Sequence, residues 1–455
     1  MTPSLLTVAL LSMLATPWSD SPALELRYTG ALHKAGQGAD TNANAVKRFN
    51  LYCAVSREAD GGRRLDYVLN ERGGGGWAWP ERFGSIALNE ALQPQSGGAL
   101  RLLFEYEGNP LVIPLQLPVA EYHARLKPGA KWTEGRENWE TVQKAKSQER
   151  DCWQVQVANN FGRKRTVWVD QAVPLLVALE EKVFVGQGDE HALTMQLEAV
   201  KPLDDKQFAS DTQPLAALLK LRTDLQRADN EFRPELSAAQ LKIAGEALPQ
   251  LQKSSADTPF SALVSAISKD VKSQLERSDE VARLAEKLVG KPAPSYSLTL
   301  IDRTQVAANQ SQGKITVLHF WEYQSDPLVE PYGQVGYLDF LYGKRRKLGV
   351  QVYGVAVDGR LGDPQTSGAA IKSIQQLKQF MNLSYGVALD DGKLLSKFGD
   401  PRRFDAKLPL WVVIGADGNI AHYQTGFYKI NPDEGLQQLD EVLVKLIREK
   451  KEKGD

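Results

Sequence analysis

The sequence predicts a multidomain protein with α+β and α/β parts: an N-terminal antiparallel, curved β-sheet, then a helical connector, then an α/β domain. Three observations support this prediction. Apolar residues alternate with period two over residues 24–209, recur every three to four positions over residues 210–289, and follow alternating strand and helix patterns over residues 290–455. At 455 residues the chain is long enough to bury two or three separate cores.

The composition is that of an ordinary globular protein. Apolar residues make up 42% and charged residues 24% of the chain, which excludes wholesale disorder. The 55 Lys and Arg residues nearly balance the 56 Asp and Glu residues, which leaves a formal charge of −1. This balance argues against nucleic acid or an anionic membrane as the main partner.

The N-terminus predicts export. Residues 1–23 read as a signal peptide, because the apolar run from Leu5 to Ala15 is too short to span a bilayer and is followed by the small-x-small triplet Ser21-Pro22-Ala23. Cleavage there would start the mature chain near Leu24 and leave no membrane span. The alternative is a buried N-terminal strand or helix, since the segment before the apolar run lacks Lys and Arg. We expect a periplasmic, cell-surface or secreted protein.

Residues 24–209 are expected to form one antiparallel sheet. Segments such as "FNLYCAVS" and "CWQVQVA" alternate between apolar and polar positions, and a helix is expected around residues 141–150. The glycine-rich "NERGGGGWAWPERFG" is expected to be a loop whose tryptophans fold back onto the sheet, although a loop that presents them to a sugar or peptide is the alternative.

The last two strands of this region, "RTVWVDQAVPLLVALEEKVF" and "HALTMQLEAVKPLDDKQF", resemble those of LolA-like lipoprotein carriers. The resemblance covers some forty residues and implies a curved sheet that holds an apolar ligand or a partner peptide. The alternative is a sheet whose concave face is filled by the chain's own helix.

The only two cysteines, Cys53 and Cys152, lie in this first region. An even number of cysteines in an exported chain favours a disulfide bond between them, and two separate buried thiols are the alternative. Neither cysteine belongs to a CxxC motif, so neither indicates redox catalysis.

The connector, residues 210–289, is predicted to contain several amphipathic helices. Apolar stripes recur at helical spacing, and "SAAQ" from Ser237 to Gln240 is a capping box that opens one helix. The pattern shows no catalytic motif, and we expect these helices to pack on a sheet.

Residues 290–455 begin a new unit after the helix-breaking "GKPAPSYSLTLID". The strand "ITVLHFWEY", a helix to about residue 348, the strand "VQVYGVAVD" and a helix near residues 371–381 follow in order. The short strand "YGVALDD", an Asp-Gly hairpin in "LPLWVVIGADGNIAHYQTGFY" and a last helix from Pro432 complete the pattern.

This order and these residues resemble the thioredoxin-like fold, in its TlpA-like and redoxin (AhpC/TSA) branch. The resemblance rests on "VGKPAPSYSL", "VLHFWEY" and "LPLWVVIGADGNI". Aligned with the family motif F-W-x-x-W-C-x-x-C, the stretch "FWEYQSDPLVEP" places Ser325 at the attacking cysteine and Leu328 at the resolving cysteine, with Pro327 between them. The family's cis-proline corresponds to Pro409, which Leu408 precedes.

The family's chemistry is not expected here, because residues 290–455 contain no cysteine. Disulfide exchange needs a thiolate that attacks sulfur and a second thiol that resolves the mixed disulfide. Ser325 is instead expected to cap the following helix, and Leu328 has no reactive atom. The sequence therefore predicts no catalytic residue, no cofactor and no metal site, since its five histidines show no triad or metal-binding spacing.

The leading hypothesis is an exported, redox-inactive thioredoxin-like protein that binds a protein or ligand or serves as a scaffold. The family's peptide groove would accept a protein or peptide partner. The candidate groove residues are Trp321, Tyr323, Pro327, Leu408 and Pro409. One alternative is a redoxin-class thiol-disulfide oxidoreductase that uses cysteines outside the usual motif. The other is a carrier of an apolar ligand in the β domain.

Overall fold

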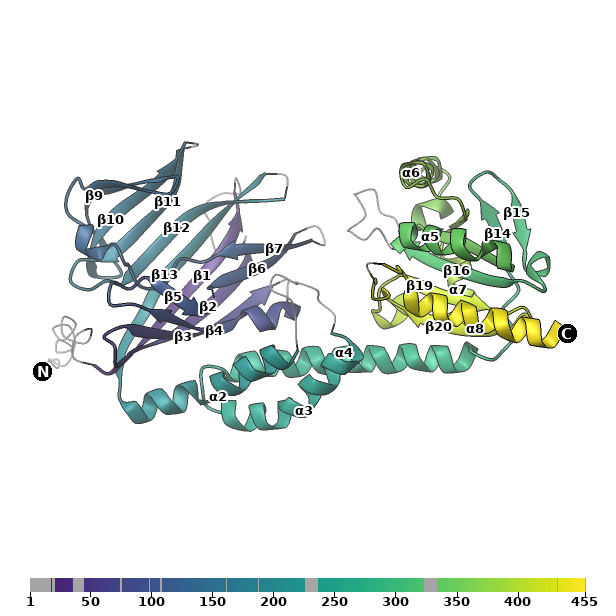
Figure 1. The fold of residues 1–455 in the computed structure, drawn as a ribbon. Coiled ribbons are helices and arrows are strands. Elements are labelled where there is room, and N and C mark those ends of the chain that lie inside the picture. The colour runs from purple at the N-terminus through teal and green to yellow at the C-terminus, as the bar shows by residue number, and fades with distance from the viewer. Residues whose placement is uncertain are drawn as a thin grey trace, which may run out of the picture. The chain divides into compact units, whose positions relative to one another are not determined.

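The chain divides into two compact units, Met1–Gln274 and Leu275–Asp455, each described here by itself (Figure 1). The computed structural model describes residues 18, 21–35, 45–73, 76–97, 99–106, 109–160, 162–186, 188–225, 236–322, 334–431 and 433–454. The boundary between the units falls inside a helix. The region expected to be a separate helical connector, residues 210–289, is therefore divided between the two units.

The first unit is built on one antiparallel sheet of eleven described strands, in the order β5-β4-β3-β2-β1-β13-β12-β11-β10-β9-β8. The strands are β1 (Ala23–Lys34), β2 (Ala45–Arg57), β3 (Arg63–Gly73), β4 (Phe83–Leu88), β5 (Pro94–Gly97), β8 (Lys131–Glu134), β9 (Glu137–Ser147), β10 (Arg150–Asn159), β11 (Gly162–Asp170), β12 (Leu176–Val185) and β13 (Asp189–Leu203). The first and last strands meet in the middle, because β1 pairs with both β2 and β13.

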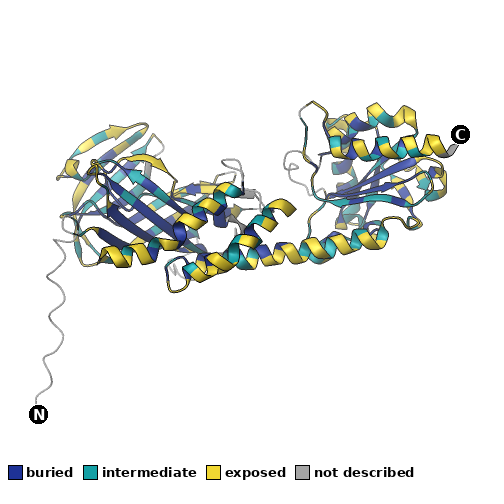
Figure 2. Ribbon diagram, turned by 60° about the horizontal axis from the view of Figure 1, so that its bottom comes forward, coloured by how far each residue is buried: buried dark blue, intermediate teal, exposed yellow. Residues whose placement is uncertain are grey.

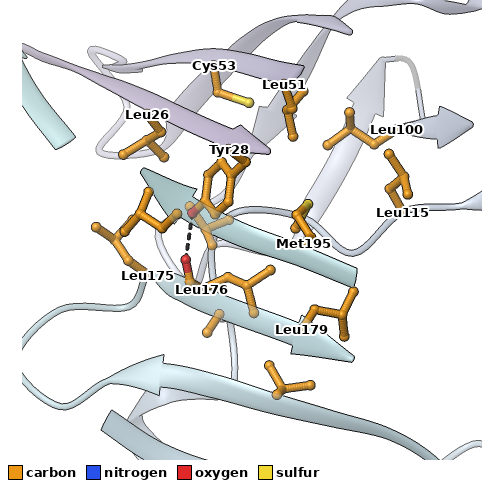
Figure 3. Close-up of a cluster of buried hydrophobic side chains, with 14 of the residues drawn as sticks. Leu26, Tyr28, Leu51, Cys53, Leu100, Leu115, Leu175, Leu176, Leu179 and Met195 are labelled. Carbon is orange, nitrogen blue, oxygen red and sulfur yellow. Dashed lines mark hydrogen bonds between the residues drawn. The ribbon is translucent and has the colours of Figure 1, made fainter. Parts of the chain in front are cut away.

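One face of this sheet is filled by the chain itself. A two-stranded hairpin, β6 (Arg101–Tyr106) and β7 (Asn109–Pro114), supplies buried residues to the same apolar cluster as the sheet. Figure 3 shows Leu100 and Leu115, at the two ends of this hairpin, close to Met195 of β13. Beside them, the Tyr28 hydroxyl donates a hydrogen bond of 2.7 Å to the carbonyl of Leu176. A helix of the chain itself on this face was the alternative to an apolar ligand, and among the described residues a β-hairpin packs there instead.

The opposite face of the sheet carries helices. Apolar residues of α2 (Asp205–Asp224), α3 (Ala238–Ser255) and the first half of α4 (Ser261–Leu288) form a second cluster with Tyr52 of β2 and Val68 of β3. The capping box at Ser237 is present, and Asp204 caps α2 by accepting the Gln207 N–H at 2.7 Å. These helices therefore pack on the sheet as expected.

The glycine-rich loop leads into a short 3₁₀ helix, η1 (Gly76–Glu81), that folds back onto these helices. The indole of Trp79 is buried, and its N–H donates a 2.8 Å hydrogen bond to Asp270 of α4. Burial of the tryptophans was the expectation and display on a mobile loop the alternative, and Trp79 is buried. The side chain of Trp77 lies outside the described residues.

The helix expected around residues 141–150 was wrong. These residues form most of strand β9 and the turn into β10. Trp139 and Thr141, two positions apart, both point into the protein, whereas the polar residues that follow lie on the exposed part of the strand. The run of Lys, Gln and Glu belongs to an exposed strand end rather than to the polar face of a helix.

The disulfide expected between Cys53 and Cys152 was also wrong. Both cysteines are free and fully buried. Cys53 lies on β2 and Cys152 on β10, and four other strands separate β2 from β10 in the sheet. A disulfide requires Cα atoms within about 7 Å, and neighbouring strands alone are about 4.8 Å apart.

The second unit contains a mixed sheet of seven described strands, in the order β15-β14-β18-β17-β16-β19-β20. The strands are β14 (Ser297–Leu300), β15 (Gln305–Ala307), β16 (Ile315–Glu322), β17 (Val350–Val357), β18 (Gly386–Asp390), β19 (Leu410–Ile414) and β20 (Ile420–Thr425). The central strand β16 runs parallel to β17 and antiparallel to β19. The expected Asp-Gly turn joins β19 to β20, with Gly418 at a φ of 82°.

Both faces of this sheet are covered, which explains why seven of the eight residues of β16 are buried (Figure 2). The helices are α5 (Val335–Arg345), α6 (Ser367–Phe380), α7 (Lys393–Lys397) and α8 (Gln437–Gly454). Helices α5, α6 and α8 contribute to one apolar cluster, and α7 with the end of α4 contributes to the other.

The last helix begins at Gln437 rather than at the expected Pro432. The side chain of Asn431 caps a turn that precedes this helix, and its oxygen accepts hydrogen bonds from the N–H groups of Asp433 and Glu434 at 2.9 and 3.2 Å. No described helix is long and apolar enough to cross a membrane.

Gly354, in the middle of β17, is required by close packing. A Cβ atom at this position would lie 2.8 Å from Tyr385 Cε2 and 3.1 Å from Trp321 Nε1. Two large, buried aromatic side chains therefore meet over a strand position that has no room for a methyl group.

We expect Gly354→Ala to destabilise the second unit by about 1–3 kcal/mol, because the two rings would have to leave their packed positions. The measurement is urea unfolding followed by tryptophan fluorescence. Gly359→Ala is the matched control, since a Cβ there would meet nothing within 4 Å. Equal stability of the two variants would contradict the packing described for Trp321 and Tyr385.

Candidate functional site

The position aligned with the family's cis-proline lies at the start of β19. The peptide bond between Leu408 and Pro409 is cis, which is the conformation that the resemblance implies there. Pro409 is buried and Leu408 is half-buried. The backbone amide and carbonyl of Leu408 make no hydrogen bond to another described residue.

The loop after β20 is fastened to Pro409. The Gly426 N–H donates a 2.7 Å hydrogen bond to the Pro409 carbonyl, and the Gly426 carbonyl accepts the Trp411 indole N–H at 3.0 Å. Phe427 comes next and leaves 49% of its surface exposed. A large apolar side chain is thus held at the surface one residue after the contact with Pro409.

The motif turn itself begins where β16 ends. Tyr323, Ser325, Pro327 and Leu328 lie outside the described residues. Trp321 is described, and its expected role as a groove residue is wrong, because it is 2% exposed and packs in the core. On a strand covered on both faces, every side chain up to the last residue is buried, so the aromatic residue that precedes the turn serves the core.

The chain just before the turn is held by an ion pair. Glu322, the last residue of β16, accepts a 2.7 Å hydrogen bond from Arg402, which also binds Asp400 through Nε and Nη2. Burial alone would raise the pKa of Asp400, but its hydrogen bonds from Arg402 outweigh this effect and lower it. Hydrogen bonding to Asp400 in turn raises the pKa of Arg402. Arg402 therefore stays charged and pairs with both carboxylates, and its single positive charge leaves one excess negative charge on the three side chains.

The chain just after the turn is held by a glutamine. Gln334, which is 1% exposed and has a φ of 65°, donates to the Tyr428 carbonyl at 2.7 Å and accepts its N–H at 3.0 Å. His422 Nε2 and the Tyr428 hydroxyl form a hydrogen bond of 2.8 Å, and burial lowers the pKa of His422. The loop that carries Phe427 is therefore joined to α5.

Nucleophilic chemistry has no support among the described residues near Pro409. The histidine nearest to the motif turn in sequence, His319, is fully buried and stacks on Trp411, with ring centroids 3.8 Å apart. It cannot reach a solvent-exposed substrate as a base. Within the described parts of the chain, no group of three or more His, Cys, Asp and Glu residues is placed to hold a metal ion.

The two cysteines are poor redox groups. Burial, with a contribution from Asp66, raises the pKa of Cys53 well above its ordinary value. Burial and Asp170 raise the pKa of Cys152 to about 11. Reactive cysteines have a lowered pKa and access to solvent, and neither thiol meets these conditions.

Sequence reasoning missed Phe427, Arg402 and Gln334. Phe427 had a signal, since it directly follows a glycine at the end of a hairpin strand. Arg402 had none, because its partner Glu322 lies 80 residues earlier in the chain. Gln334 is equally remote from Tyr428 in sequence, at 94 residues.

Comparison with known proteins gives a family for one part of the chain. The sequence model of the AhpC/TSA family matches residues 289–423. Two curated relatives, the thiol-disulfide oxidoreductases ResA of Bacillus thuringiensis and Bacillus cereus, are each 24% identical over 159 residues, which cover 35% of this chain and 78% of the relative.

Solved structures of similar proteins were also found. A thiol:disulfide interchange protein of the thioredoxin family from Chlorobium tepidum is 18% identical, with 34% of this chain and 96% of that chain covered and a TM-score of 0.27. A secreted Mycobacterium tuberculosis disulfide oxidoreductase is 18% identical, with 33% and 96% covered and a TM-score of 0.25.

The family match agrees with the strand order of the second unit and with the cis bond before Pro409. The C-terminal part of the chain is therefore a thioredoxin-like domain of the AhpC/TSA redoxin superfamily, similar to thiol-disulfide oxidoreductases.

Proposed function

We propose that this protein is an exported, redox-inactive member of its superfamily whose thioredoxin-like domain binds an extended peptide segment of a partner protein beside Pro409. Two observations together support the proposal. The Leu408 amide and carbonyl beside the cis bond make no hydrogen bond to another described residue, and residues 275–455 contain no cysteine.

The loss of chemistry follows from the residues themselves. Disulfide exchange passes through a mixed disulfide between enzyme and substrate, and no side chain of residues 275–455 can form one. The remaining thiols belong to the other unit and are buried. With a pKa of about 11, only about one in ten thousand Cys152 side chains is a thiolate at pH 7.

Three features of the described surface beside Pro409 support this proposal. The N–H and carbonyl of Leu408 offer one donor and one acceptor to an extended chain, in the manner of an added strand. The exposed ring of Phe427 supplies apolar area for a side chain of the partner. Arg402 pairs with both Glu322 and Asp400 at the end of β16, and the one excess negative charge of these three side chains favours an apolar or basic segment over an acidic one.

The alternative, a thiol-disulfide oxidoreductase, is suggested by the names of the curated relatives. It would require Cys53 or Cys152 to become exposed and to react, against the packing and the raised pKa of both thiols. The third reading, a carrier of an apolar ligand, has less support, because buried residues of the β6–β7 hairpin already pack in the apolar cluster on this face. Binding beside Pro409 requires neither an exposed thiol nor space on this sheet face.

We expect the purified protein to leave the rate of dithiothreitol-driven insulin reduction unchanged and to consume no peroxide. The physical reason is that no accessible thiolate is present near Pro409. The control is the double variant Cys53→Ser with Cys152→Ser, measured at the same concentration. Insulin reduction that the wild-type protein accelerates and the double variant does not would establish the oxidoreductase alternative.

We expect Phe427→Ala to weaken binding of a reduced and alkylated, unfolded polypeptide such as α-lactalbumin by about 5- to 30-fold, since a central aromatic contact usually contributes 1–2 kcal/mol. The measurement is fluorescence anisotropy of the labelled polypeptide. The matched control is Phe380→Ala at the end of α6, where the ring is 76% exposed. Equal losses in both variants, or no binding by the wild-type protein, would count against the groove.

A further inference from the structure

The segment that the sequence assigns to a cleaved leader contains a residue that belongs to the folded domain. The guanidinium carbon of Arg63 lies 4.2 Å from the ring centroid of Trp18. Arg63 Nη2 also donates a 2.9 Å hydrogen bond to the Trp18 carbonyl. Trp18 is half-buried and packs against the main apolar cluster of the first unit.

Arg63 depends on this contact. It is the first residue of β3, it is only 8% exposed, and burial lowers its pKa. A buried cation needs compensation, and a tryptophan ring face with a carbonyl oxygen supplies both a cation–π contact and a charge-assisted hydrogen bond. Trp18 therefore contacts Arg63 through both its indole ring and its backbone carbonyl.

Pro22 and Ala23, which precede the predicted mature start, are also built into the sheet. The Pro22 carbonyl accepts the Arg57 N–H at 3.1 Å. Ala23 is 3% exposed and lies between Ser56 of β2 and Leu203 of β13. A chain cleaved before Leu24 would place its new α-ammonium group at a residue that is 1% exposed, flanked by a strand on each side. Burying that charge is unfavourable.

We infer that Trp18 is part of the folded first unit, so that N-terminal processing removes no more than residues 1–17. Cleavage between Ala23 and Leu24, which the small-x-small triplet suggests, would remove a working part of the domain. The processing step is ordinary hydrolysis of one peptide bond, in which water completes the new carboxylate and the new amino group. The statement about processing rests on the proposed export, whereas the role of Trp18 in the fold does not.

The first test is the intact mass of the full-length gene product recovered from the extracytoplasmic fraction of an expressing cell. The expected mass corresponds to a chain whose first residue is Trp18 or an earlier residue. A mass that corresponds to a chain starting at Leu24 overturns the inference. The result is independent of any redox or peptide-binding assay, so the two proposals fail separately.

The second test is thermal unfolding of the full chain with Trp18→Ala. We expect the midpoint temperature of the first unit's unfolding transition to fall by about 2–4 °C, which is the shift that the loss of one cation–π contact would cause in a unit of this size. Trp18→Phe should lose less, since a phenyl ring still faces Arg63. Phe184→Ala, at a ring that is 64% exposed in the same unit, is the matched control. Equal midpoints for Trp18→Ala and Phe184→Ala would overturn the inference.

Discussion

The hydrogen bond from the Gly426 N–H to the Pro409 carbonyl is the contact on which the candidate site depends. It joins the start of β19 to the loop after β20. The Trp411 indole N–H donates a second hydrogen bond to the carbonyl of the same glycine. Because this loop is fixed, Phe427 stays at the surface while Tyr428 turns inward to meet Gln334. The position of this loop is therefore fixed by one hydrogen bond between backbone groups and by the side chains of Trp411 and Gln334.

The contacts that hold the second unit together do not require the cysteines of the family motif. Strand pairing and the burial of β16 provide the stability, and they require no thiol. The described surface beside Pro409 keeps the exposed ring of Phe427 and the ion pair of Arg402 with Glu322 where the motif turn begins. These features are the basis on which we propose binding of a peptide segment.

Much of the fold could be predicted from local patterns, and the misses have physical causes. The capping box at Ser237 and the Asp-Gly turn at Gly418 are short-range signals, and both are present. The helix expected at residues 141–150 failed because an exposed strand end and a polar helix face look alike in composition. The pairing of Cys53 with Cys152 failed because strand order, which decides distance, is not encoded locally. Partners such as Arg402 depend on contacts across 80 residues.

The most direct measurement of the central claim restores the missing thiols. In the double variant Ser325→Cys with Leu328→Cys, the thioredoxin alignment predicts an intramolecular disulfide after mild oxidation and a gain of disulfide reductase activity, because only the sulfur atoms are missing. Both positions lie outside the described residues, so the alignment alone makes this prediction. A folded double variant whose two thiols stay unbridged and inactive would contradict the account of residues 289–423 as a redoxin domain that has lost only its cysteines.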